Sequence, residues 1–165
     1  IGSANPCPCG FFGDKTRECL CTPLQISRYL GKISGPLMDR FDIQIEVPAI
    51  PFEELSMNSK SEKSSSIRSR VNRARRVQIE RYKNDGIFYN SQLSSKLIDK
   101  YCKINSRQRK MMRNAFVSLN LSARAYIRIL KVARTIADLD KSENIQDHHL
   151  AEAIQYRRLD RQYWI

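Results

Sequence analysis

Two closely spaced pairs of cysteines are the residues of this sequence best suited to chemistry. Four of the five cysteines lie within residues 7–21, as Cys7 and Cys9 followed by Cys19 and Cys21. Because nothing in the sequence indicates secretion, four thiols on two short arms favour a tetrahedral, structural zinc site over disulfides. Each pair encloses one residue, fewer than common zinc sites have, so packed free thiols and disulfides stay open as alternatives.

A run of positive charge is the second feature suited to chemistry. Residues 60–83 hold nine Lys or Arg and two Glu, a net charge of +7 out of +12 for the chain. This charge favours contact with nucleic-acid phosphates without reading of the bases, since only Tyr82 offers a ring for stacking. The alternative is a solvated helix that packs on an acidic neighbouring subunit. The candidate contact residues are Arg68, Arg70, Arg73, Arg75, Arg76 and Arg81.

The overall composition narrows the class of protein. With 41% hydrophobic and 28% charged residues, the 165-residue chain has the composition of an ordinary globular protein. It holds no apolar run of about 18 residues and no leader peptide, so we predict a cytoplasmic protein with no membrane partner. A pI near 9.8 favours a polyanionic partner such as DNA. The chain begins at Ile1 rather than Met, which we interpret as a cut inside a longer protein.

Short elements should position the cysteines in the first 52 residues. Thr22 and Pro23 predict an N-cap and the first position of a helix that ends at Gly31. Residues 41–47 alternate strictly between apolar and polar, which predicts a strand. The stretch from Ser56 to Ser66 is rich in Ser, Lys and Glu, which is typical of a linker or of the entry to the next helix, and we place the linker at residues 53–65.

The rest of the chain should be a bundle of helices. Apolar residues at helical spacing predict helices over residues 66–83, 91–103, 106–119, 122–139 and 147–157. Ser122 and Asp147 are the expected N-caps of the last two helices, and Cys102 is expected to be a small core residue. In the first helix we predict one inward stripe, made of Ile67, Val71, Ala74 and Gln78.

Three segments, in this order, resemble one family. They are residues 5–10 (Asn-Pro-Cys-Pro-Cys-Gly), residues 34–42 (Ser-Gly-Pro-Leu-Met-Asp-Arg-Phe-Asp), and residues 121–126 (Leu-Ser-Ala-Arg-Ala-Tyr) with their continuation to residue 139. Together with the tail at residues 149–157 they look like the C-terminal part of ComM-type magnesium-chelatase-like AAA+ ATPases. The resemblance implies a mainly α fold. The C-terminal end of an AAA+ α/β core with a Cys-rich loop would span residues 1–52, and a helical lid would span residues 66–165.

The resemblance also implies catalytic and nucleotide-sensing roles. Asn5 matches sensor 1, where a side-chain amide can orient the water that attacks the γ-phosphate. Arg40 matches the arginine finger, whose guanidinium meets transition-state charge in a neighbouring subunit. Arg124 matches sensor 2, in the first turn of a helix, where a cation opposes the helix dipole. Without the family, Arg40 would be a surface arginine paired with Asp39 or Asp42.

The resemblance implies a hexameric ATPase motor that acts on DNA, as in competence or branch migration. The phosphate-binding pattern Gly-x-x-x-x-Gly-Lys-[Ser/Thr] is missing from residues 1–165, and Glu53 and Glu54 do not follow a buried strand. We therefore expect ATP and Mg²⁺ to bind only to the full-length protein, assembled as a ring. The fragment alone should be inactive, and it could be a monomer. The alternatives are a stand-alone zinc-dependent nucleic-acid-binding module and a magnesium-chelatase ATPase subunit.

Overall fold

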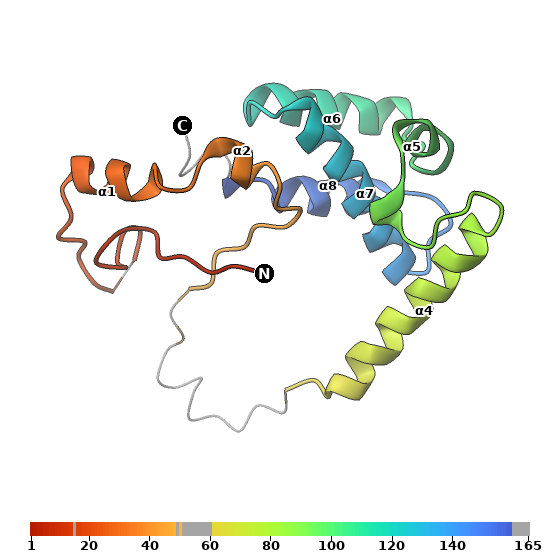
Figure 1. Cartoon of the computed structure of the whole chain (residues 1–165), viewed down its shortest axis with the longest axis horizontal. Coiled ribbons are helices and arrows are strands. Elements are labelled where there is room, and N and C mark those ends of the chain that lie inside the picture. The colour runs from red at the N-terminus through yellow and green to blue at the C-terminus, as the bar shows by residue number, and fades with distance from the viewer. Residues whose placement is uncertain (15, 49, 51–60, 160–165) are drawn as a thin grey trace.

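All of the regular secondary structure in the described residues is helical. A computed structural model describes residues 1–14, 16–48, 50 and 61–159 (Figure 1). Two short helices come first, and a longer group follows the segment at residues 51–60. Their bounds are α1 Pro23–Leu30, α2 Gly35–Met38, α4 Ser64–Tyr82, the 3-10 helix η1 Asn90–Gln92, α5 Ser95–Tyr101, α6 Ser106–Ser118, α7 Ala123–Leu139 and α8 Asp147–Gln155. The predicted mainly α fold is confirmed.

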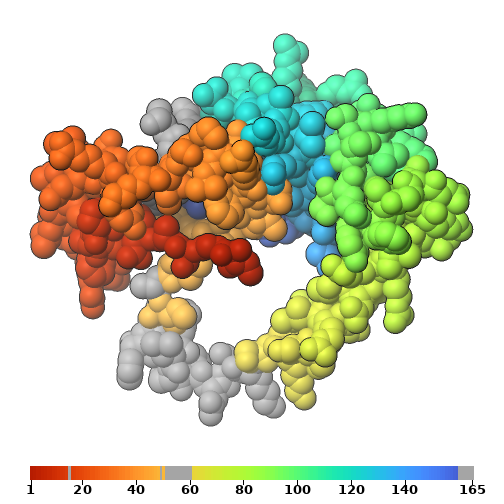
Figure 2. Space-filling model, in the orientation of Figure 1, coloured from red at the N-terminus to blue at the C-terminus, as the bar shows by residue number. Residues whose placement is uncertain are grey.

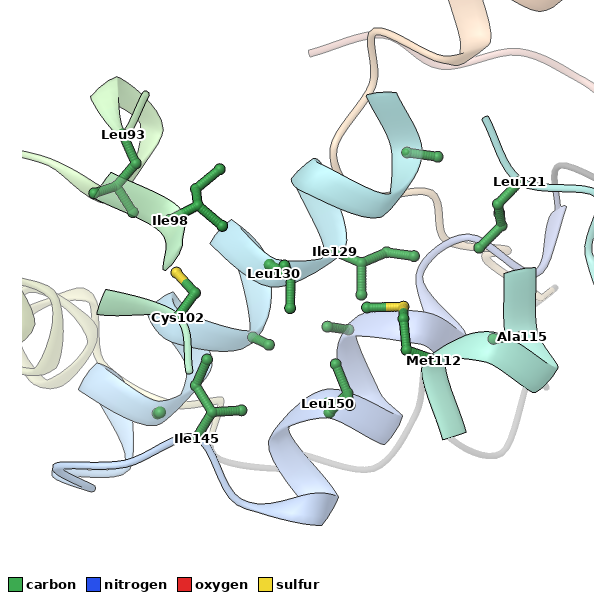
Figure 3. Packing of buried hydrophobic residues seen from close by; sticks show 14 of the residues in the cluster. Leu93, Ile98, Cys102, Met112, Ala115, Leu121, Ile129, Leu130, Ile145 and Leu150 are labelled. Carbon is green, nitrogen blue, oxygen red and sulfur yellow. The ribbon is translucent and has the colours of Figure 1, made fainter. Parts of the chain in front are cut away.

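Helix α7 is the centre of the helical bundle. It contacts α8, α4, α5 and η1, while α6 packs on α8. Its inward face carries Ala125, Ala133 and Ala137, all fully buried, so neighbouring helices can approach its backbone closely. Larger side chains such as Ile129, together with Leu150 of α8, fill the remaining space (Figure 3). Cys102 is buried in this core, as predicted.

Local capping signals set several helix ends. Thr22 caps α1 in a capping box with Gln25, and Gly31 follows the last residue of α1, as predicted. The Ser122 hydroxyl accepts a 3.1 Å hydrogen bond from the backbone N–H of Ala125, which confirms the predicted cap of α7. The prediction for α8 was one residue off. Its N-cap is Gln146, and Asp147 is the first residue inside the helix.

The predicted strand at residues 41–47 is wrong. The described residues contain no strand, and this segment is irregular. The segment also has no buried apolar face: Gln44 is its only buried residue, whereas Ile43, Ile45 and Val47 are 53%, 66% and 78% exposed. The backbone N–H of Gln44 donates to the Tyr156 carbonyl at 3.0 Å, at the end of α8. Alternation becomes a strand only when a partner strand accepts its backbone hydrogen bonds, and here the end of a helix takes that place.

Two helix predictions also need correction. Residues 91–103 do not form one helix: η1 and α5 are separate, because Leu93 and Ser94 between them have extended ψ angles of 122° and 167°. The predicted linker at residues 53–65 ends inside α4, which starts at Ser64, and residues 53–60 of that prediction lie outside the described part. The domain boundaries therefore stay a prediction.

The first half of α4 stands clear of the bundle. Every residue from 61 to 73 is exposed, and Ala74 is the first buried residue of the helix. The predicted inward stripe is therefore only half correct, since Ala74 and Gln78 are buried but Ile67 and Val71 are 43% and 44% exposed. In the space-filling view this arm of α4, in yellow, points away from the packed helices (Figure 2). Among the described residues no helix is long and apolar enough to cross a membrane.

Candidate functional site

The two pairs of cysteines meet at one point. The Sγ atoms of Cys7 and Cys9 are 3.4 Å apart, and the Cys19 sulfur lies 3.7 Å from the first and 3.6 Å from the second. With Cys21, all four sulfurs lie within 4.8 Å of one another, and we call this group the four-cysteine cluster. All are free thiols, so the disulfide alternative finds no support in the structure.

Tight turns bring the two arms together. The N–H of Gly10 donates to the Cys7 carbonyl at 3.1 Å and closes the first turn. Gly10 and Gly13 have φ angles of 85° and 84°, which side-chain-bearing residues rarely adopt. Glycine at these two positions therefore meets a backbone requirement of the turns.

Backbone amides point at the sulfurs and shift their acidity. A hydrogen bond from the N–H of Phe11 lowers the pKa of the Cys9 thiol to about 6. The N–H of Cys21 also favours the Cys19 thiolate, but burial and the neighbouring Cys9 and Cys7 together raise the pKa of Cys19 to about 12. Four thiols this close cannot all ionise unless a cation offsets their charge.

Two arginines hold the loop that carries Arg40. Arg128 of α7 donates to the Arg40 carbonyl at 2.7 Å and pairs with Asp42. Arg157, fully buried after α8, donates to the Phe41 carbonyl and lies 3.4 Å from Asp39. Neither arginine was predicted to have a role at this loop. Their binding partners are more than 80 residues away along the chain, and a lone arginine in a helical pattern carries no signal of such a contact.

The carboxylates on either side of Arg40 are therefore bound to other arginines. In the structure Asp39 and Asp42 pair with Arg157 and Arg128, and not with Arg40 as the simple alternative expected. The Arg40 side chain is exposed and, among the described residues, makes no hydrogen bond or ion pair.

Of the two predicted sensor residues, Arg124 lies near an arginine that binds this loop, and Asn5 lies beside the four-cysteine cluster. Arg124 is exposed and lies one helical turn before Arg128, on the same face of α7, with about 5–6 Å between the Cβ atoms of such a pair. Asn5 is exposed beside the four-cysteine cluster. Its Nδ2 lies 3.8 Å from the point where a Cβ would stand if Gly10 were replaced by another residue. In the described part of the chain, no hydrogen bond or ion pair joins Asn5, Arg40 and Arg124.

Five of the six predicted contact arginines have exposed side chains on α4. Six residues line one shallow hollow on the side of the helix opposite Ala74 and Gln78, and we call this group the α4 polar face. Its three arginines are exposed and make no ion pair among the described residues. Arg70 instead pairs with Glu62, and Arg75 lies 4.4 Å from the centre of the Tyr89 ring. The α4 polar face consists of Ser65, Arg68, Ser69, Asn72, Arg73 and Arg76.

Arg81 does not belong to this surface, which corrects the prediction. Its guanidinium is 15% exposed and binds both carboxylate oxygens of Asp138. Asp138 is itself buried in α7 and also receives hydrogen bonds from Arg134 at 3.1 Å and from Asn90 at 2.9 Å. Asn90 further accepts a hydrogen bond from the Tyr82 hydroxyl at 2.5 Å. Arg81 therefore holds α4 against α7 and is not available to a ligand.

A second cluster of possible metal ligands has the wrong hydrogen bonds for a metal. The Nε2 atoms of His148 and His149 lie 3.4 and 3.1 Å from one oxygen of Asp140. His149 is fully buried, and its Nδ1 accepts a 2.9 Å hydrogen bond from the N–H of Gln146. A metal-bound histidine normally donates from its other nitrogen, so this arrangement favours a proton on Nε2. Hydrogen bonds from His149 and His148 lower the pKa of the Asp140 carboxyl.

The fold and these sites define a class of protein: a Cys-rich loop region joined to a bundle of helices around a central α7. Two family sequence models match the chain in this order. One, described as magnesium chelatase subunit ChlI, matches residues 1–55, and the other, its C-terminal part, matches residues 61–157. The chain belongs to the magnesium chelatase ChlI family.

Individual relatives agree with this assignment. The chain is 42% identical over 163 residues to competence protein ComM of Haemophilus influenzae, and 41% identical to the uncharacterized protein YifB of Salmonella typhimurium. Each alignment covers 98% of this chain and 31% of the relative. An uncharacterized protein of Mycobacterium tuberculosis is 31% identical over 94% of the chain and 30% of its own length. The chain thus spans under a third of the length of these relatives.

Proposed function

We propose that this chain is the C-terminal part of a hexameric AAA+ ATPase motor that acts on DNA. In this proposal Arg40 is the arginine finger, Asn5 is sensor 1 and Arg124 is sensor 2. Membership of the magnesium chelatase ChlI family and the likeness to competence protein ComM support the ATPase and its assembly into a ring. The division of the chain into a core part at residues 1–52 and a lid at residues 66–165 belongs to the same proposal.

The position of Arg40 is the observation that carries the proposal. An arginine finger must be held firmly at its backbone while its guanidinium stays free to reach phosphate. Arg128 and Arg157 bind the backbone carbonyls of Arg40 and Phe41 and take up both nearby carboxylates. The exposed Arg40 guanidinium is then available to a nucleotide in a neighbouring subunit.

This chain would contribute positively charged side chains to the site, and not the loop that binds ATP and Mg²⁺. The exposed guanidinium groups of Arg40 and Arg124 fit a triphosphate, because each offers parallel donors to phosphate oxygens. ATP would supply the phosphoryl group that is transferred to water. The sequence pattern that wraps phosphate and holds Mg²⁺ is missing from residues 1–165, so we assign that task to other parts of the protein.

The α4 polar face is the proposed contact with DNA. Its three arginines, which form no ion pair within the described part of the chain, lie on the side of α4 away from the core, and the first half of this helix extends beyond the bundle. Serine and asparagine side chains between them can donate hydrogen bonds to phosphate oxygens. The face has no aromatic member, so contact with the DNA backbone without base stacking fits it best.

A charge-removal experiment tests the DNA contact. In the full-length protein, we expect replacement of Arg68, Arg73 and Arg76 by alanine to weaken DNA binding and to abolish the DNA-stimulated part of ATP hydrolysis. The slope of log K against log salt should become shallower by roughly 0.9 for each phosphate that the variant no longer neutralises. DNA binding measured by fluorescence anisotropy between low and moderate salt gives this slope.

The matched control removes the same charge from the other side of the molecule. Arg17, Arg28 and Lys32 are exposed and lie in or near α1, far from α4 (Figure 1). Their replacement by alanine should leave the salt slope as it is. An equal weakening in both variants would mean that net charge, rather than the α4 polar face, holds the DNA.

The second candidate function is a stand-alone zinc-dependent nucleic-acid-binding module. It is favoured by the presence of the four-cysteine cluster and a basic arm in one chain. This function predicts that the 165-residue chain alone binds DNA, and that a chelator abolishes the binding. The motor instead predicts ATP hydrolysis by the full-length protein. The family description suggests a third function, that of a magnesium-chelatase ATPase subunit. This function predicts that the full-length protein takes part in the insertion of Mg²⁺ into a porphyrin.

A further inference from the structure

The sulfurs of the four-cysteine cluster are spaced like the ligands of a single ion. The distances among Cys7, Cys9 and Cys19 are 3.4–3.7 Å, and Cys21 completes the group. Four sulfurs at tetrahedral corners, each about 2.3 Å from one zinc ion, would be about 3.8 Å apart. A cluster of several irons between the same cysteines would hold their sulfurs further apart.

Amide groups around the cluster are arranged to support thiolates. The backbone N–H groups of Phe11, Cys21 and Cys9 lie where they favour the thiolate forms of Cys9, Cys19 and Cys21, in that order. A donor aimed at a ligand sulfur stabilises its negative charge and fixes its direction, as outer-shell groups do in metal sites. A packed thiol needs none of these donors, because an S–H group buries as a small hydrophobic group.

The region around the cluster lacks a hydrocarbon core. Among the described residues from 1 to 37, Cys7 is the only buried one. The apolar side chains Phe12, Leu20 and Leu24 are 39%, 85% and 60% exposed. Burial of apolar surface therefore cannot account for the fold of this region, whereas the helical bundle has a large core of its own.

We propose that Cys7, Cys9, Cys19 and Cys21 bind one zinc ion, which takes the place of a hydrophobic core for residues 1–22. Binding converts the four thiols to thiolates and releases their protons to solvent. Four protein ligands close the coordination sphere, so the ion is structural and takes part in no reaction. This inference rests on the cluster alone and does not depend on the proposed ATPase function.

Metal analysis of the purified chain tests the identity of the ion. The 165-residue chain, produced in medium with both zinc and iron and purified without a metal column, should contain about one zinc per chain. Its zinc X-ray absorption should fit four sulfurs at about 2.3 Å. The Cys7→Ser and Cys19→Ser variants should contain no zinc, whereas Cys102→Ala, whose thiol lies in the helical core, should retain it. A chain without metal, or one with iron and sulfide, would overturn the proposal.

Hydrogen exchange tests what the ion does for the fold. On removal of zinc with a strong chelator, amides in residues 1–22 should lose protection, while the core amides of α7 and α8 should keep theirs. Readdition of zinc should restore the protection. If residues 1–22 exchange equally fast with and without zinc, the ion does not hold this region together. This measurement uses the unmodified chain, so a variant that fails to fold cannot obscure the result.

Discussion

Replacement of Asp138 by alanine should lower the free energy of unfolding by about 3–5 kcal/mol. Asp138 is 1% exposed and accepts hydrogen bonds from Arg81, Arg134 and Asn90. Without its carboxylate, the largely buried guanidinium groups of Arg81 and Arg134 would lose the negative charge that they pair with. The cost would come mainly from these unpaired charges. Urea unfolding followed by circular dichroism measures it.

Two comparisons separate this explanation from an ordinary packing defect. Asp99→Ala, on the exposed surface of α5, should change the free energy of unfolding by less than about 0.5 kcal/mol. A triple variant with Arg81→Met, Arg134→Met and Asp138→Leu removes all the charges together, and it should be more stable than Asp138→Ala alone. If Asp138→Ala costs less than about 1 kcal/mol, or if the triple variant is the less stable of the two, unpaired charge is not the cause.

The helices of this protein could be predicted because their signals are local. The bounds of α6 and α7 match the predicted ranges to within one residue. The apolar spacing runs along each helix, and the caps Asn105 and Ser122 stand directly before their first residues. The break between η1 and α5 could not be predicted in this way. Leu93, before Ser94, keeps helical spacing with Leu97 and Tyr101 after it, so the apolar pattern runs on across the break.

The buried ion pairs could not be predicted from the sequence for a different reason. Arg81 has the same type and spacing as the solvated arginines before it, and only its contact with Asp138, 57 residues later, sets it apart. One signal was present: Arg134 and Asp138 are four residues apart on the apolar face of α7, next to Ala133 and Ala137. Two opposite charges on a buried face indicate an internal ion pair.

The strand prediction failed because alternation specifies faces and not partners. Within residues 41–47 only Gln44 is buried, and the segment is bound by Arg128 of α7 and by the residues that follow α8, not by a strand. The same segment adjoins Arg40. Contacts between segments more than 80 residues apart thus decide both how this loop is held and which way its arginine is free to turn.

Replacement of Arg40 by alanine should reduce ATP hydrolysis by the full-length protein by roughly 10³-fold or more. The proposed finger stabilises charge on the transferring phosphoryl group, and this stabilisation is absent from the ground state. Arg40→Lys should recover little of the rate, because an ammonium group lacks the planar pair of donors. Arg28→Ala, which removes an exposed arginine from α1, is the matched control and should retain the rate.

Mixed rings test whether Arg40 acts on a neighbouring subunit. A ring made only of Arg40→Ala subunits, and one made only of subunits with a disabled phosphate-binding loop, should both be inactive. When the two are mixed, some interfaces join an intact Arg40 to an intact phosphate-binding loop, so part of the activity should return. Mass spectrometry must first establish that the rings are mixed. Inactive mixed rings would then show that Arg40 does not act across the interface, and an active Arg40→Ala ring would remove it from catalysis altogether.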